Sequence, residues 1–163
     1  MNPLDVDELH EMILRLGCAT FVGIVLGIDR DLHKKPAGLR VLAMVSLGSC
    51  AITMVSISSL ARVANAPVDG VLRTVQGILS GIGFLGAGAI MRLQGKDEVH
   101  GLTTAASIWI CAILGMISAL GQWTLGLCTF VFAWVILVFG SWAEHRLLRW
   151  TESPKLPVEK PSP

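Results

Sequence analysis

Five long runs of apolar residues, separated by short polar stretches, dominate the pattern along the chain. They cover residues 9–28, 39–60, 71–91, 102–120 and 122–142. A helix that crosses a bilayer needs about 20 mostly apolar residues, and each run has roughly that length. The fifth run is apolar all round, whereas a helix of a soluble bundle keeps a polar face. The pattern therefore predicts an all-α, polytopic membrane protein with five transmembrane helices.

Basic residues are concentrated on one side of these predicted helices. They follow the first, third and fifth helices as Arg30, Lys34, Lys35, Arg40, Arg92, Lys96, Arg146, Arg149, Lys155 and Lys160. The other side carries only Arg62 and Arg73 next to the acidic N-terminus. An excess of Lys and Arg marks the cytoplasmic side of a membrane protein. We therefore expect residues 1–8 to be periplasmic and residues 143–163 to form a cytoplasmic tail, disordered toward its proline-rich end.

Composition narrows the classes of function. The chain has 163 residues, of which 53% are hydrophobic and 15% charged, and its formal net charge is +1. Because no basic patch is present, we expect no nucleic-acid partner. Its four cysteines lie inside apolar runs without metal-ligand spacing, so they are interpreted as small hydrophobic residues. No catalytic triad, catalytic dyad or phosphate-binding loop is recognisable, and we expect neither an enzyme nor a metal or cofactor site.

The third apolar run is rich in glycine. The stretch "GILSGIGFLGAGAIMR" has Gly77 and Gly81 at G-x-x-x-G spacing, with Gly88 on the same side and a second small pair, Gly83 and Ala87, on another face. In lipid, helices associate through close van der Waals contact, and small residues allow it. The pattern predicts that this helix is the centre of the bundle and that the fifth is outermost. The candidate packing or partner-binding residues are Gly23, Gly27, Gly77, Gly81, Gly83, Gly86 and Gly88.

Polar residues inside the predicted spans form two groups. Ser46, Ser49 and Thr53 lie on one stripe of the second helix, and Arg73 and Gln76 share a side of the third helix near its outer end. The stripe is typical of interhelical packing, with ion permeation as the alternative. Arg73 is a functional candidate because it is ionisable, or it extends to the membrane surface. The middle third of every predicted span lacks an acidic residue, which disfavours coupling to magnesium or protons.

Two ion pairs are expected near helix ends. Asp29 ends the first helix and Arg40 begins the second, and each position is unfavourable for its charge in the helix dipole. We predict that the two pair across the loop, the alternative being that both are solvated. Arg15 has Glu11 one turn before it, which is the spacing of a helical ion pair.

Three motifs resemble the MgtC/SapB family of bacterial inner-membrane proteins. They are "GIDRD" followed by "KPAGLR", then "GIGFLGAGAIMR", then "HGLTTAASIWICAILG". The resemblance covers about residues 10–140. It departs from the family at Asp29 and Asp31, which stand where glutamates are expected. The polar residues that the resemblance singles out are Asp29, Arg30, Asp31, Pro36, Gly38, Arg40, Arg92, Gly101, Thr103 and Thr104.

The resemblance implies a function but leaves two mechanisms open. It implies a multi-pass inner-membrane protein linked to growth at low magnesium and, in pathogens, to survival in macrophages. The favoured mechanism is non-enzymatic regulation of a membrane partner, such as a membrane subunit of the F-type ATP synthase. The alternative is transport of magnesium or another ion. A homodimer through spare glycine faces is also compatible with the sequence. The segment after the fifth helix is too short for the cytoplasmic domain of some relatives, so regulation through such a domain is not expected.

Overall fold

A computed structural model describes residues 6–33, 35–62, 69–92 and 99–151. Within these residues, five helices are long and apolar enough to cross a membrane, which confirms the predicted fold class. Two strands of two residues each lie between the third and fourth helices. The helices and strands in chain order are α1 (Val6–Leu32), α2 (Leu39–Ala61), α3 (Asp69–Ala89), β1 (Met91–Arg92), β2 (Val99–His100), α4 (Leu102–Ala119) and α5 (Trp123–Thr151).

The bounds differ from the predicted ones mainly in the first and last helices. Helix α1 runs on to Leu32, through the charged residues that were expected to form a loop. Helix α5 continues to Thr151, into the segment predicted to be a tail. Residues 1–5 and 152–163, together with Lys34 and Lys96, lie outside the described residues.

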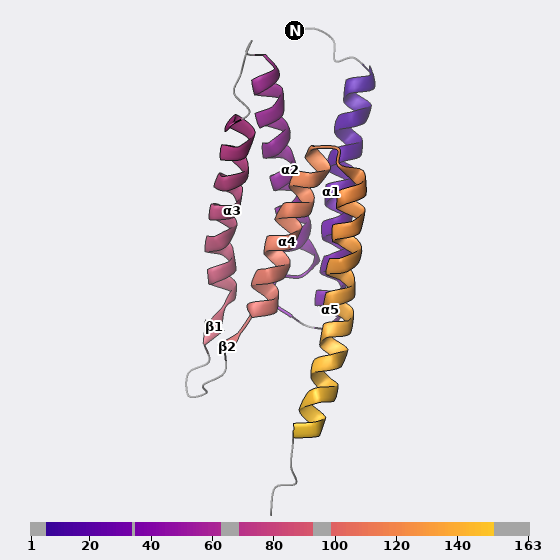
Figure 1. The fold of residues 1–163 in the computed structure, drawn as a ribbon, viewed down its shortest axis with the longest axis vertical. Coiled ribbons are helices and arrows are strands. Elements are labelled where there is room, and N and C mark those ends of the chain that lie inside the picture. The colour runs from indigo at the N-terminus through magenta and orange to yellow at the C-terminus, as the bar shows by residue number, and fades with distance from the viewer. Residues whose placement is uncertain (1–5, 34, 63–68, 93–98, 152–163) are drawn as a thin grey trace, which may run out of the picture.

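Left-handed glycines mark both ends of α4. Gly101 precedes the helix with a φ of 95°, and Gly121, in the turn to α5, has a φ of 68°. Side chains other than glycine rarely adopt this conformation. Strands β1 and β2 are antiparallel, with Met91 opposite His100, and β2 ends directly before Gly101. We call the end of the bundle that holds β1 and β2 the hairpin end, and the end that holds the α4–α5 turn the turn end (Figure 1).

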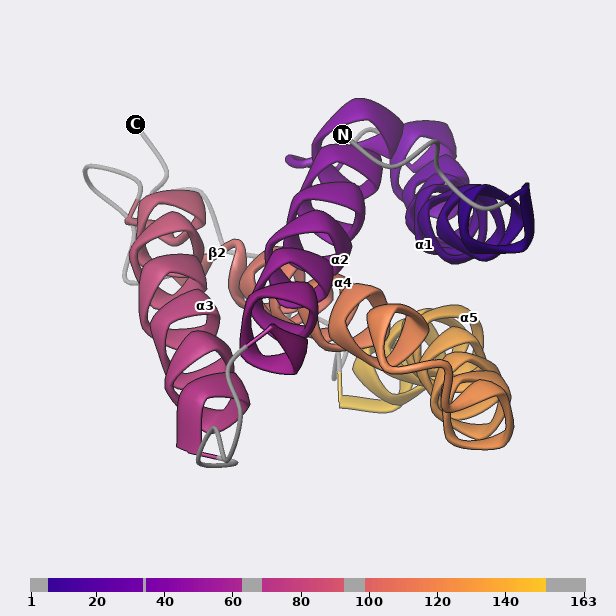
Figure 2. The same ribbon diagram turned by 90° about the horizontal axis from the view of Figure 1, so that it is seen from above.

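Helix α4 is the centre of the bundle. It packs against α1, α2, α3 and α5, and most of its length is buried. Figure 2 shows α4 between the other helices, with α3 at one edge and α5 at another. The prediction that α3 is central is therefore wrong, because almost all of α3 faces outward. The peripheral position expected for the fifth helix is confirmed.

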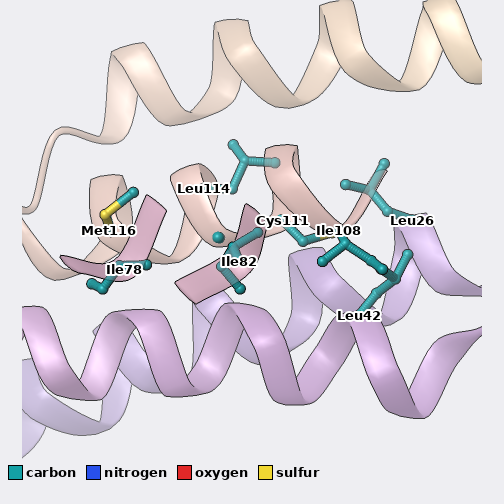
Figure 3. Packing of buried hydrophobic residues seen from close by; sticks show 9 residues of the cluster. Leu26, Leu42, Ile78, Ile82, Ile108, Cys111, Leu114 and Met116 are labelled. Carbon is teal, nitrogen blue, oxygen red and sulfur yellow. The ribbon is translucent and has the colours of Figure 1, made fainter. Parts of the chain in front are cut away.

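The buried hydrophobic residues form one main cluster around α4. Leu26 of α1, Leu42 of α2 and Ile82 of α3 meet Ile108 and Cys111 of α4 (Figure 3). Small residues bring the backbones of the helices into direct contact at three other positions. A Cβ at Gly23 would lie 2.6 Å from the carbonyl oxygen of Leu42, one at Gly27 would overlap Leu39, and one at Gly115 would overlap the carbonyl of Ser46. These contacts join α1 to α2 and α2 to α4.

Candidate functional site: a buried arginine and two open grooves

A buried arginine connects three parts of the hairpin end. Arg30 lies in the last turn of α1 and is only 1% exposed. Its Nε and Nη2 donate to the carbonyl oxygen of Pro36, at 3.4 and 3.3 Å, in the loop that leads to α2. Its Nη1 donates to the hydroxyl of Ser107 at 3.0 Å, and its Nη2 also donates to the hydroxyl of Thr104. The side chain therefore holds α1, the loop and α4 together.

Neutral oxygens satisfy this guanidinium. Besides Pro36, Thr104 and Ser107, Nη1 reaches the carbonyl oxygen of Thr103 at 3.5 Å. Within the described part of the chain, no carboxylate lies within salt-bridge distance of Arg30. A buried charge is tolerated when hydrogen bonds replace its hydration, and the fork of donors in arginine suits several acceptors at once. Arg30 is therefore built into the fold at the hairpin end.

The predicted ion pair between Asp29 and Arg40 does not form. Asp29 lies 3.4 Å from Nδ1 of His33, one turn further along α1, and Arg40 is exposed. Asp31 takes a role that the sequence did not suggest, because its carboxylate accepts a hydrogen bond of 3.0 Å from the backbone N–H of Leu39. That N–H begins α2 and has no acceptor inside the helix. Gly38 lies against the same carboxylate, which a Cβ there would overlap.

A second arginine of α1 binds the other end of α4. Arg15 forms the predicted ion pair with Glu11 at 2.7 Å, which confirms it. Its Nη1 also donates to the carbonyl oxygen of Ala119 at 2.6 Å, where α4 ends. The last carbonyl groups of a helix accept no hydrogen bond from within the helix, and they form the negative end of its dipole. A cation beside them is therefore stabilising. Helix α1 thus contacts both ends of α4 through arginine side chains.

The hydroxyl stripe of α2 is buried between helices. Ser46 and Thr53 are fully buried, and the Thr53 hydroxyl donates to the carbonyl oxygen of Ser49 at 2.7 Å. The hydroxyl of Ser46 is buried without a hydrogen-bond partner in the described part of the chain. The stripe therefore packs inside the bundle, with one polar group left unsatisfied there.

Most glycines of α3 contact no other helix in the part of the chain that the structure describes. A Cβ at Gly77, Gly81, Gly83 or Gly88 would meet no atom within 4 Å, and of the five candidate glycines of α3 only Gly86 faces a neighbour, at 3.5 Å from Cβ of Ala105. The expectation that other helices of the bundle approach α3 at its glycines is therefore wrong at four of its five candidate positions. Space for the approach of another helix is present on α3 and is not used within the chain.

Two apolar grooves flank α3. The first, which we call the α3–α5 groove, has a volume of about 690 Å³ and α4 as its floor. Gly83 and Ala87 line its α3 side, and Trp109, which is 46% exposed, lines its floor. The second, the α2–α3 groove, has a volume of about 600 Å³ and includes Gly77 and Gly81. The two small-residue faces predicted for α3 thus point into different grooves.

The remaining candidates lie at the surface or at the hairpin end. Arg73, Gln76 and Thr103 are exposed, whereas Thr104 is buried in the Arg30 cluster. Gly101 is packed against the carbonyl of Ala89, and the side chain of Arg92 lies outside the described residues. Among the described residues, no group of three or more His, Cys, Asp or Glu residues could hold a metal ion.

Sequence reasoning missed Ser107 of α4, and it recognised Gly115 only as one of several small packing residues of that helix. Ser107 completes the Arg30 cluster, and Gly115 allows the closest approach of α4 to α2. A signal for Ser107 was present, because it follows Thr103 and Thr104 by one turn and therefore shares their face of the helix. Gly115 is a small residue in an apolar run, as the glycines of α3 are. The sequence alone does not indicate which of these glycines another helix approaches.

Comparison with known proteins agrees with the motifs. A family model described as the MgtC family matches residues 16–146. Protein SrpB of Synechococcus elongatus is 43% identical over 69% of this chain and 65% of its own length. Protein SapB of Bacillus subtilis is 34% identical over 84% of this chain and 60% of its own. YhiD of Escherichia coli K12, named as a candidate magnesium transporter, is 34% identical over 78% and 59%. The chain thus matches about three-fifths of each of these relatives. No solved structure matches.

Proposed function

The chain belongs to the MgtC family, and from that premise we propose that it is a non-enzymatic regulator of the bacterial inner membrane. In this proposal the protein binds a membrane partner through helix packing. The partner we favour is a membrane subunit of the F-type ATP synthase. The regulator supports growth at low magnesium and, in a pathogen, survival in macrophages. The chain matches only about three-fifths of each of these relatives, so the regulatory activity and the partner are proposed for it and are not taken over from them.

The observation that carries this proposal is the open α3–α5 groove. Gly83 lines it and has free space where a side chain would be, and Ala87 lies one turn further along α3. A transmembrane helix gains association energy chiefly where its backbone can approach another closely. The groove offers such an approach over α3 and α4 together, with Trp109 and Ile136 as large apolar contacts. A helix of a second protein is therefore a suitable occupant.

Capture from native membranes tests the proposal. Cells grown at low magnesium carry the tagged chain with a photo-crosslinking residue at Ala106, which lies in the groove. We expect a crosslink to an ATP synthase membrane subunit, and its loss in Gly83→Leu. Leu127→Ala, on an exposed position of α5 that does not line the groove, is the matched control. Capture that is unaffected by Gly83→Leu would contradict the proposal.

A second candidate function is ion transport. The name of YhiD supports it, as does the buried, unpartnered hydroxyl of Ser46 in the interior of the bundle. Purified protein in liposomes separates the two functions. Magnesium or proton flux above that of empty vesicles, abolished by Ser46→Ala or Thr53→Val, would establish transport. Flux at the level of empty vesicles, together with partner capture, would support regulation.

We further propose that the hairpin end faces the cytoplasm. Its loops carry most of the basic residues that flank the helices, and positive charge is retained on the cytoplasmic side. Labelling of single cysteines in whole cells with a membrane-impermeant thiol reagent tests this orientation. We expect Leu120→Cys at the turn end to react and Leu32→Cys at the hairpin end to be protected until the cells are opened. The opposite pattern would reverse the assignment.

A further inference from the structure

We propose that a second copy of this chain docks on the exposed face of α3 that borders the α2–α3 groove, forming a two-fold dimer about an axis along the membrane normal. The contact surface is the outer ridge of α3, which we define as Asp69, Arg73, Gly77, Gly81 and Leu85. These residues follow one another at every fourth position and are all exposed. The surface lies on the opposite side of α3 from Gly83, so the inference goes beyond the partner proposed above.

The glycines of the ridge leave room for a helix backbone. Gly77 and Gly81 line the α2–α3 groove, together with Gly48 of α2, and a Cβ at any of the three would meet nothing within 4 Å. Figure 2 shows α3 at the edge of the bundle, so a neighbouring helix can reach this face from the membrane. Pairs of glycines at this spacing allow right-handed helix crossings with direct backbone contact. Space alone, however, would also suit a lipid chain.

A polar group in the groove favours a helix over a lipid chain. Ser49 is only 5% exposed, its residue lines the α2–α3 groove, and its hydroxyl forms no hydrogen bond within the described part of the chain. A hydroxyl that opens into an apolar groove without a hydrogen-bond partner is unfavourable, and an acyl chain cannot supply one. A helix packed into the groove can, through a carbonyl oxygen exposed beside a glycine or through a hydroxyl such as that of Ser80.

Two unpaired charges indicate that the helix belongs to a second copy. Asp69 and Arg73 lie one turn apart on the ridge, and neither forms an ion pair in the described part of the chain. In a two-fold dimer about the membrane normal, both copies of α3 present these residues at the same depth. Asp69 of each copy can then pair with Arg73 of the other, giving two reciprocal contacts. An unrelated helix would have to carry the same two charges at the same height.

The largest exposed side chain of α3 completes the self-complementary surface. Phe84 is 82% exposed and lies between Gly81 and Gly88 on the same face. In the dimer, the ring of one copy packs over the glycine surface of the other. The ridge therefore provides both the projecting group and the space for it.

Charge complementation between two differently tagged copies tests the dimer. Both copies are expressed together, extracted from membranes, and scored by capture of one tag and detection of the other. Asp69→Arg alone gives four basic residues at the contact and Arg73→Asp alone gives four acidic ones, so we expect each to lower self-capture by at least about tenfold. Asp69→Arg expressed with Arg73→Asp restores opposite charges and should return capture to the wild-type level. Single variants that self-associate normally, or a mixed pair that stays low, would overturn the proposal.

A pair of glycine variants separates this dimer from the proposed partner complex. Gly81→Leu should abolish self-capture, whereas Gly83→Leu, on the same helix but in the α3–α5 groove, should retain it. Because a Cβ at either position would meet no other described residue, both variants should keep the helical circular dichroism and elution volume of the folded protein. A strictly monomeric wild type in liposomes, dissociation by Gly83→Leu alone, or unfolding by Gly81→Leu would each overturn the inference. Failure of ATP synthase capture would leave the dimer result intact.

Discussion

Gly23 of α1 lies directly against Leu42 of α2, so closely that a Cβ on residue 23 would lie 2.6 Å from the Leu42 carbonyl oxygen. The same Cβ would lie 2.7 Å from Cα of Ala43. Because both neighbours are backbone atoms, they cannot rotate away as a side chain would. Helices α1 and α2 can therefore keep their present separation only while residue 23 is glycine.

We predict that Gly23→Ala destabilises the bundle although alanine is the better helix former. Forcing a methyl group into a close-packed contact costs about 1–3 kcal/mol. The matched control is Gly17→Ala on the same helix, where a Cβ would meet nothing within 4 Å. That change should be neutral or stabilising by up to about 1 kcal/mol. Unfolding by SDS from mixed micelles, followed by tryptophan fluorescence, measures both variants, and equal stability would contradict the contact.

Arg30→Lys should be strongly destabilising despite keeping the charge. The guanidinium binds Pro36, Thr104 and Ser107 from three different nitrogen atoms, whereas a lysine has a single nitrogen. A hydrogen bond between a charged donor and its acceptor contributes about 1.5–3 kcal/mol, so losing one or two of them should lower the unfolding free energy by at least about 1.5 kcal/mol. The same unfolding assay measures the change.

A double-mutant cycle locates the source of that loss. Ser107→Ala and Arg30→Lys remove the same contact, so their effects should be less than additive, with a coupling of about 0.5–3 kcal/mol. Ser118→Ala, which removes a hydroxyl bonded within α4 itself, serves as the comparison and should add independently to Arg30→Lys. Full additivity of Ser107→Ala with Arg30→Lys would show that the Arg30 cluster does not act as a unit.

Asp31→Ala should cost more stability than Asp29→Ala, although both remove a carboxylate from the same turn. Asp31 accepts the otherwise unpaired N–H of Leu39, and the loss of such a cap costs about 0.5–2 kcal/mol. Asp29 has only a half-exposed histidine beside it, so its removal should stay within about 0.5 kcal/mol. Arg40→Gln should be equally mild, since Arg40 is exposed and outside these contacts. A larger loss from Asp29 than from Asp31 would reverse this assignment.

Gly101→Ala should be among the most damaging single substitutions in the chain. Its left-handed φ of 95° disfavours a side chain, and the added Cβ would also overlap the carbonyl of Ala89. Gly121 has a left-handed φ as well, but its nearest neighbour would be the flexible end of Arg15 at 3.3 Å. Asparagine tolerates that conformation, so Gly121→Asn should be folded and Gly101→Asn should not. Yield of monodisperse protein after detergent extraction distinguishes them.

The sequence was sufficient for the five helices because apolar length is a property of each segment alone. The ion pair of Arg15 and Glu11 was predictable for the same reason, since both residues lie in one helix. The centre of the bundle was not predictable in this way. Glycines show where a backbone can be approached but not which helix approaches it, and the crowded centre turned out to be α4, where small residues such as Ser107, Ala112 and Gly115 are distributed around the helix.

The wrong pairing of Asp29 with Arg40 has a similar cause. The dipole argument treated both residues as ends of helices, but α1 continues to Leu32 and so changes which side chains point inward. Successive residues on a helix are rotated by about 100°, so Arg30 faces the bundle interior while Asp29 does not. A boundary error of four residues was enough to assign the interior position to the wrong residue.

The two arginines of α1 also fix how the bundle can move. Fifteen residues separate Arg15 from Arg30, and fifteen separate Thr104 from Ala119, the groups they bind on the antiparallel α4. These two contacts oppose sliding of α4 along α1, because any axial shift displaces both of them at once. Sideways displacements of α3 and α5 break neither of these two contacts, so we expect them to cost less free energy. The conformational freedom of the bundle is therefore expected at its edges and not along its axis.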